Sequence, residues 1–221
     1  MAEELLFRLL KLLELFGVWL SVLAWFTVSG GATAMAWALR GVRDRRVWGW
    51  AVAMFVVALV ANLADYFVTL HRSPDLSWEA NPLWRNVVDS YGLTMAKWYG
   101  FSGKIFVSIL AAQFLAYYLA HRERLYPQRA GSLSEFLRGM GGRSRTVRER
   151  LLALFTVFSF FFAGVSLLYF YVAYANWLED ADTYAYLPPF PIVVVTFVAA
   201  LVGAFVALTY RAFCAAQPLE R

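Results

Sequence analysis

The side chains that could do chemistry in this chain gather between residues 62 and 108, beside long apolar stretches. An ionisable group in the hydrocarbon of a membrane costs about 2.5 kcal/mol or more, so such groups are usually paired and mark a site or a pathway. Any function must therefore be argued from this set, which we call the polar cluster. Its members are Asp65, Thr69, Glu79, Asn81, Lys97 and Lys104.

The spacing of the polar cluster predicts which of its charges meet. Asp65 and Thr69 are four residues apart, and Lys97 and Lys104 are seven apart, so each pair shares one face of a helix. At 1.5 Å per residue, Asp65 lies about 7–8 Å inside the end of its helix and Lys104 about 12 Å inside the start of the next. The lysine stem can reach outward to the carboxylate. We predict an Asp65–Lys104 ion pair, with Lys97 as the competing partner.

A short helix is predicted between these two longer helices. Asn81 is a suitable N-cap and Pro82 a suitable first helical residue, and the helical pattern 83–91 ends at Gly92. Glu79 precedes this helix N-terminus, where unpaired amides favour a negative charge. If the short helix folds back toward the membrane, Glu79 and Asn81 close over Asp65 and the lysines, which makes an outward-facing polar chamber.

The sequence assigns no catalytic residue, metal or cofactor. Asp65 has no second aspartate at comparable depth, and no serine has a recognisable nucleophile motif. Asp65, His71 and Glu79, at spacings of six and eight, match no metal signature. His71 lies at the outer end of the second span and His121 at the inner end of the third, so the two are not placed to ligate one haem. The single cysteine, Cys214, excludes an internal disulfide and a cysteine-only metal cage.

The elements that must position the polar cluster are long apolar segments. The 221 residues are 61% hydrophobic and 16% charged, which is too apolar for an ordinary soluble domain. Five stretches reach the roughly 20 residues that cross a bilayer. We therefore predict an all-α polytopic protein, residues 1–221 forming a single membrane domain, with spans at 18–39, 48–70, 96–120, 151–175 and 191–213. Residues 1–16 form an amphipathic segment that either lies in the interface or extends the first helix.

The basic residues follow the membrane pattern rather than that of a nucleic-acid-binding protein. Fourteen of the twenty lysines and arginines fall in 40–46, in the loop 121–150 and near the C-terminus. The positive-inside rule places these segments in the cytoplasm and the N-terminus outside a cell membrane, so no nucleic-acid partner is expected. Within the basic loop 121–150, residues 132–140 are predicted to form a short helix with Leu133, Phe136 and Leu137 on one face.

Part of the chain resembles an uncharacterised family of small prokaryotic membrane proteins, a domain of unknown function. The shared pattern is an intramembrane D-x-x-x-T, then E-x-N-P, then a lysine in the next helix. The resemblance covers residues 62–108 and implies no activity. The matching residues are Asp65 and Thr69; Glu79, Asn81 and Pro82; and Lys104 or Lys97.

Three functions fit the polar cluster. The first is a non-catalytic accessory or scaffold subunit, in which the cluster clasps two helices and a loop within a larger membrane complex or a homo-oligomer; paired charges can fix helix register. The second is an intramembrane enzyme that acts on a lipid or another anionic headgroup, with Asp65 or Glu79 as general base. The third is a carrier of an ion or small solute. We favour the first, with the bilayer itself as the surrounding partner.

Overall fold

The computed structural model describes residues 2–77, 81–142, 146–178 and 190–217. Within these ranges the chain is helical and contains no strand. Five helical segments in them are long and apolar enough to cross a membrane, which confirms the predicted number of spans. Every one of the five overlaps a stretch that hydropathy had indicated.

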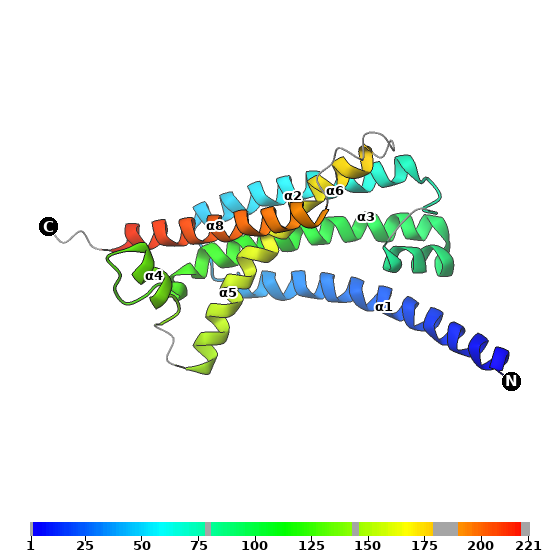
Figure 1. The fold of residues 1–221 in the computed structure, drawn as a ribbon, viewed down its shortest axis with the longest axis horizontal. Helices are drawn as coiled ribbons and strands as arrows, with labels where there is room; N and C mark the ends of the chain where they lie inside the picture. Colours follow the sequence, from blue (N-terminus) through cyan, green and yellow to red (C-terminus); the bar gives the residue numbers. More distant parts are fainter. Residues whose placement is uncertain (1, 78–80, 143–145, 179–189, 218–221) are drawn as a thin grey trace.

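The spans form an elongated bundle (Figure 1). The first three are α1 (Ala2–Ala38), α2 (Arg45–Arg72) and α3 (Pro82–His121), and the last is α8 (Phe190–Ala216). The backbone of α1 is one continuous helix, so residues 2–16 extend the first span; their amphipathic character stays a prediction. The arginine-bearing segments 40–46 and 121–142 lie at one end of the bundle, and we call it the arginine-rich end.

The fourth span is two helices, which corrects the prediction of one unbroken helix over 151–175. α5 (Val147–Val165) and α6 (Leu168–Trp177) are separated by a turn at Ser166 and Leu167. The Ser166 hydroxyl donates to the Ala163 carbonyl at 2.7 Å, and the Leu167 amide donates to the Gly164 carbonyl at 2.9 Å. These three-residue bonds replace the regular helical ladder, and α6 continues in a different direction from α5 (Figure 1).

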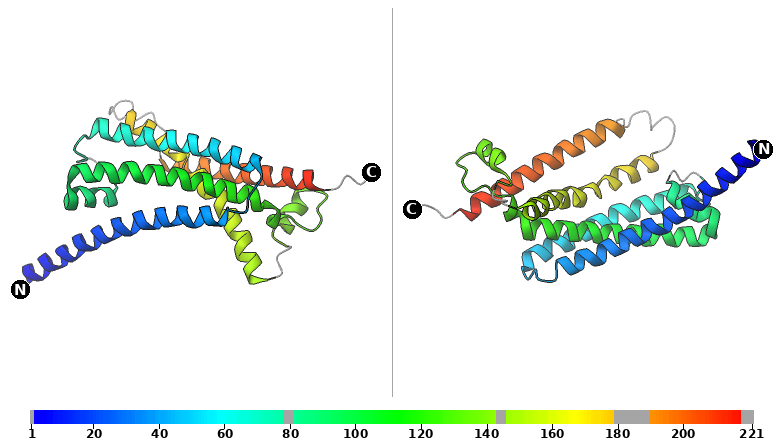
Figure 2. Two further views of the ribbon diagram at one scale, coloured as in Figure 1. Left: turned by 180° about the vertical axis from the view of Figure 1, so that it is seen from behind. Right: turned by 90° about the horizontal axis from the view of Figure 1, so that it is seen from below.

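Helix α3 is the centre of the arrangement. It packs against α1, α2 and α5, whereas α6 packs against α2, and α8 packs against α5 and η1 (Arg122–Leu125). The two views of Figure 2 show α1 on one side of α3 and the α5, α6 and α8 helices on another. Helices α1 and α6 therefore flank the same end of α3, although neither makes substantial backbone contact with the other.

The predicted short helix is present as the first part of α3. The Asn81 side chain accepts a hydrogen bond from the Leu83 amide at 3.0 Å, with Pro82 in the first turn, as the capping pattern indicated. Gly92 then adopts φ of 81°, a conformation that other residues rarely take, and this reverses the chain. Residues 82–91 consequently fold back along the start of the long part of α3 (Figure 1).

The folded-back position of residues 82–91 depends on close packing of one tryptophan side chain against a glycine. The side chain of Trp84 is 4% exposed, and a Cβ atom at Gly100 would lie only 2.4 Å from its ring. The Ser21 hydroxyl of α1 also donates to the Leu83 carbonyl at 2.9 Å. Because any larger residue at position 100 would overlap the ring, glycine is what allows the short helix to pack this closely.

The basic loop contains a short packed helix, α4 (Leu133–Gly139), as predicted. Only part of its expected apolar face is used, since Phe136 is fully buried whereas Leu133 and Leu137 are 44% and 45% exposed. Phe136 contacts the rings of Tyr210 and Phe213 near the end of α8, at centroid distances of 5.3 and 5.2 Å. This aromatic contact attaches the loop to the last span.

Candidate functional site

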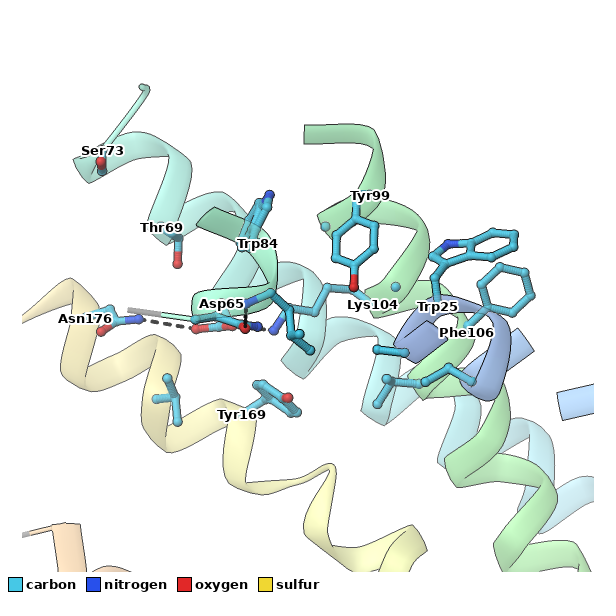
Figure 3. A pocket seen from close by; sticks show the side chains of 18 of the residues that line it. Trp25, Asp65, Thr69, Ser73, Trp84, Tyr99, Lys104, Phe106, Tyr169 and Asn176 are labelled. Atoms are coloured by element: carbon cyan, nitrogen blue, oxygen red, sulfur yellow. Dashed lines mark hydrogen bonds and ion pairs between the residues drawn. The ribbon is translucent and has the colours of Figure 1, made fainter. Parts of the chain in front are cut away.

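A cavity of about 620 Å³ lies at the end of the bundle away from the arginine-rich end. Its walls come from four helices: α1 around residues 24–28, α2 around 65–73, both parts of α3, and α6 around 169–176. Segments far apart in the sequence, from Ala24 to Asn176, thus converge on one space. Figure 3 shows their side chains pointing toward it.

The predicted ion pair is present on the wall of this cavity. The Lys104 ammonium lies 2.6 Å from Oδ2 of Asp65, and the two side chains are 15% and 9% exposed. Lys97 makes no ion pair within the described part of the chain; its backbone carbonyl accepts a hydrogen bond from the Tyr66 hydroxyl at 3.1 Å. Lys104, the deeper lysine, is thus the partner of Asp65.

The second carboxylate oxygen of Asp65 is held by the fourth span. Nδ2 of Asn176 on α6 donates to Oδ1 of Asp65 at 3.2 Å. Arg72, two helical turns after Asp65, donates to the backbone carbonyl of the same asparagine. The carboxylate of Asp65 therefore links α2 to both α3 and α6 (Figure 3). No local sequence pattern specifies these two contacts.

The ammonium of Lys104 also contacts an aromatic ring. Its Nζ lies 3.9 Å from the ring centroid of Tyr169, in the first turns of α6. A cation over an aromatic face gains about 0.5–2 kcal/mol, with larger values where water is excluded. Tyr169, Val172 and Asn176 all line the cavity at spacings of three and four, so one face of α6 forms this wall.

Three further aromatic side chains line the cavity, and their polar atoms form hydrogen bonds with other parts of the protein. Trp25 donates to the Ser102 hydroxyl at 3.1 Å, Trp84 to the Ala96 carbonyl at 2.5 Å and Tyr99 to the Ser21 carbonyl at 3.0 Å. Their N–H and O–H donors are satisfied within the protein, so what they offer a ligand is aromatic surface. The cavity thus combines a small charged region with extensive apolar walls.

The loop after α2 is also ordered around a cavity residue. Ser73, which lines the cavity and is 4% exposed, donates to the Asp75 carboxylate at 3.1 Å. The Ser77 amide and hydroxyl donate to the same oxygen, and these hydrogen bonds lower the pKa of Asp75 below its ordinary value of 3.8. Leu76 between them is 2% exposed at a φ of 59°, an uncommon backbone conformation for a residue with a side chain.

The structure brings most of the described polar cluster together. Asp65, Thr69, Asn81 and Lys104 all line the cavity, whereas Lys97 does not. Glu79 lies outside the described residues, so the expectation that it covers Asp65 stays a prediction.

The sequence reasoning missed the contribution of the fourth span and of the aromatic walls. Asn176 and Tyr169 lie in or next to the predicted span 151–175, a stretch rich in aromatics in which the sequence indicated no site residue. The available signal was an amide in an otherwise apolar segment, seven residues after a tyrosine and hence on the same helix face.

The site offers ligand contacts rather than a recognisable catalytic or metal centre. Among the residues that the structure describes, no three histidine, cysteine or acidic side chains converge where they could hold a metal ion. Comparisons of the chain with models of protein families, with curated proteins and with solved structures find no match. What this site does must therefore be inferred from its geometry and chemistry.

Proposed function

We propose that this chain is a non-catalytic membrane protein that binds an amphipathic small molecule in the cavity beside Asp65. The observation that carries this proposal is the cavity itself, because about 620 Å³ falls within the range of about 300–1,000 Å³ that small-molecule pockets occupy. Its few polar groups converge on one region between mainly apolar walls, which is the usual composition of such pockets.

The positive-inside rule supports the outer half of the cell membrane as the location of this pocket. The cavity lies at the opposite end of the bundle from residues 40–46 and 121–142, which carry most of the described arginines. With that arginine-rich end and the C-terminus in the cytoplasm, the N-terminus and the pocket are on the outer side. The bound molecule is then drawn from the outer leaflet or from the external solution.

The state of the Asp65 carboxylate favours binding over catalysis. One of its oxygens accepts a hydrogen bond from Lys104 and the other from Asn176, so both oxygens are oriented by neighbouring groups. A general base must reach the proton that it removes at about 2.6–3.2 Å, and here the described contacts orient both oxygens toward donors of the protein itself. An enzyme acting on a lipid headgroup remains the alternative, because Asp65 borders a cavity of sufficient size.

A glycine on the cavity wall provides a direct test. Gly103 lines the cavity, and a Cβ atom there would meet no atom within 4 Å, so Gly103→Leu adds a bulky side chain to the cavity wall at a position open to a Cβ. Gly203 on α8 has equally open surroundings and is exposed, which makes Gly203→Leu the matched control. Wild type and both variants are purified in detergent and mixed with palmitate, palmitoyl-lysophosphatidylcholine and hexadecyltrimethylammonium. Native mass spectrometry then measures the adducts.

We expect at least one of these amphiphiles to remain on the wild type and on Gly203→Leu and to be lost from Gly103→Leu. Equal adducts on all three proteins would show attachment to the general apolar surface and would overturn the proposal. Release of a chemically altered amphiphile by the wild type, but not by Asp65→Asn, would establish the enzyme alternative instead.

A second candidate, the accessory or scaffold subunit, is supported by the apolar surfaces of α1 and α8. The most apolar stretches of these two helices are each only 17% buried within the chain. Val195 of α8, at 68% exposure, is a suitable position for a photocrosslinking amino acid. Crosslinking in native membranes to one discrete partner or to a second copy of the chain would support this role, whereas crosslinks to lipid alone would argue against it.

A further inference from the structure

We propose that the cavity binds a molecule of no net charge that presents a carbonyl oxygen to Lys104 at the deep end, with an apolar body between the aromatic walls. This inference rests on the proposed binding function and specifies the chemical class of the ligand. It follows from where the ion pair lies along the cavity, from its net charge and from the hydrogen-bond donors that it leaves available.

The ion pair lies at the deep end of the cavity. On α2 the lining runs inward from Ser73 to Asp65. On the long part of α3 it runs inward from Tyr99 to Val107, with Lys104 three residues before this inner limit. Eight residues of helix span about 12 Å. A ligand that contacts the pair must therefore carry a polar atom well inside the bundle rather than at the membrane surface.

The charge balance of this deep region favours a ligand without net charge. Within the described lining, Asp65 and Lys104 are the groups at the deep end that ionise near neutral pH, and together they carry no net charge. Arg72 lies at the outer end and is engaged by the protein itself. An anionic or a cationic group beside the pair would thus bring an uncompensated charge into the interior of the membrane, which is costly for either sign.

Lys104 offers a hydrogen-bond donor that the protein does not use. An ammonium group has three N–H donors, and within the described residues that of Lys104 donates to Asp65 alone. Its second contact is with the face of the Tyr169 ring, at 3.9 Å from the centroid. The Thr69 hydroxyl borders the same space and has no hydrogen bond among the described residues (Figure 3). Both oxygens of Asp65 already accept hydrogen bonds, so the ligand must supply the acceptor.

A carbonyl group on an apolar body meets these conditions. Its oxygen accepts a charge-assisted hydrogen bond although the carbonyl itself is uncharged. The rings of Trp25 and Phe106, whose centroids are 5.5 Å apart, and those of Trp84 and Tyr99 provide apolar surface for the rest of the molecule. The carbonyl can belong to a ring ketone or quinone or to the ester of an acyl lipid. Among the amphiphiles above, palmitoyl-lysophosphatidylcholine has such an ester and no net charge.

Such a molecule has a route from the lipid phase. Helices α1 and α6 both line the cavity, but α1 packs against α3 and α6 against α2, without substantial backbone contact between α1 and α6. The described parts of these two helices therefore leave one side of the cavity uncovered by packed backbone. An uncharged molecule dissolved in the bilayer can enter from this side without passing through water.

The test varies the polar group on a constant apolar body. 2-Acetylnaphthalene carries a ketone, 2-isopropylnaphthalene has the same shape without an acceptor, and naphthalene-2-sulfonate and (2-naphthylmethyl)trimethylammonium carry a charge of either sign. Methyl palmitate and octadecane make the same comparison for an acyl ester. Dissociation constants are measured by equilibrium dialysis on the purified full-length protein in detergent. Binding is assigned to the cavity where Gly103→Leu weakens it and the control Gly203→Leu does not.

We expect the ketone or the ester to bind about tenfold more tightly than its hydrocarbon counterpart, because a hydrogen bond from a charged group contributes at least this factor. Both charged probes should bind more weakly than the ketone. The carbonyl compound with the larger preference over its hydrocarbon identifies a ring carbonyl or an acyl ester as the source, and either supports the proposal.

Substitutions at the ion pair test the donor separately from the fold. Lys104→Arg keeps the charge and the N–H donors, so the preference for the carbonyl over the hydrocarbon should persist. The double variant Asp65→Val/Lys104→Met leaves no unpaired charge and should bind the carbonyl compound and the hydrocarbon equally. A merely structural role of Lys104 would change both affinities alike and leave their ratio at the wild-type value.

Four results would overturn this assignment. Hydrocarbons that bind in the cavity as tightly as both carbonyl compounds would refute the carbonyl while leaving the binding function intact. A charged probe that binds there more tightly than the ketone would refute the neutral ligand. A carbonyl preference that persists in Asp65→Val/Lys104→Met would refute the role of Lys104. Absence of any binding sensitive to Gly103→Leu would refute this inference, and the proposed function as well if the amphiphiles above also fail to bind.

Discussion

The ion pair between Asp65 and Lys104 should be strongly coupled in stability. Its charged atoms are 2.6 Å apart in side chains that are 9% and 15% exposed. At an effective dielectric constant of about 20, two unit charges at this distance attract by roughly 6 kcal/mol. Desolvation opposes this attraction, so the pair adds little net stability, but removing one partner leaves a buried uncompensated charge and costs about 3–5 kcal/mol.

We expect Asp65→Asn and Lys104→Met each to lower the melting temperature substantially, and the double variant to recover much of the loss. For domains of this size 1 kcal/mol corresponds to about 2–4 °C, so each single substitution should lower the melting temperature by roughly 6–20 °C. The assay is thermal unfolding of the ligand-free protein in detergent, analysed as a double-mutant cycle. Lys97→Met is the matched control and should change little, because Lys97 has no ion pair among the described residues.

Two results would refute this reasoning. Single variants that melt with the wild type would show that the two charges are not tightly coupled in the folded protein. Additive losses in the double variant would show that each side chain acts through other neighbours, such as Asn176 or Tyr169. A loss for Lys97→Met equal to that for Lys104→Met would mean that the cycle reports general damage to α3.

Three further substitutions test other packed elements of the structure. Gly100→Ala should destabilise the protein by about 1–3 kcal/mol in thermal unfolding, because its methyl group would overlap the buried ring of Trp84. Phe136→Ala should cost about 3–5 kcal/mol and increase proteolysis of the basic loop, because this fully buried ring attaches α4 to α8. Asp75→Asn should remove a pH dependence of stability. Since hydrogen bonds from Ser77 lower the folded-state pKa of Asp75 below 3.8, its contribution is present above that value and is lost as the pH falls through the lowered pKa.

Each of these predictions has a control or a contradicting result. Gly203→Ala, at an open and exposed position, should not destabilise the protein; a loss equal to that for Gly100→Ala would contradict the role of Trp84. Leu137→Ala, in the same short helix but 45% exposed, should leave proteolysis unchanged. An acid-unfolding profile for Asp75→Asn that superimposes on that of the wild type would contradict the third prediction.

Local patterns were enough to predict the spans and the short helix before the long part of α3. Length and hydropathy indicate a membrane-crossing helix whatever its neighbours are, and the five predicted stretches match the five candidate spans. Asn81, Pro82 and Gly92 act on backbone within one turn of themselves, so the beginning and end of the short helix were also correct. The same patterns missed the turn at Ser166, because an apolar stretch can be helical on both sides of a break.

The candidate site was predicted in part. Depth along the helices put Asp65 within reach of the Lys104 stem, and the structure contains that contact. Spacing alone left Lys97 as a competitor, because the stem of either lysine can reach several ångströms along a helix. The choice between them depends on how α2 and α3 pack, which no local pattern specifies.

The sequence by itself determined which segments are long and apolar enough to cross a membrane, where the short helix begins and ends, and which charged side chains lie within the spans. Only the tertiary structure decided that Asn176 and Tyr169 of α6 complete the environment of the ion pair, and that Trp25 and Trp84 enclose a cavity beside it. The physical reason is the sequence distance over which each property acts. Hydropathy and capping are properties of adjacent residues, whereas Asp65 and Asn176 are 111 residues apart and meet because the turn at Ser166 redirects α6 onto α2.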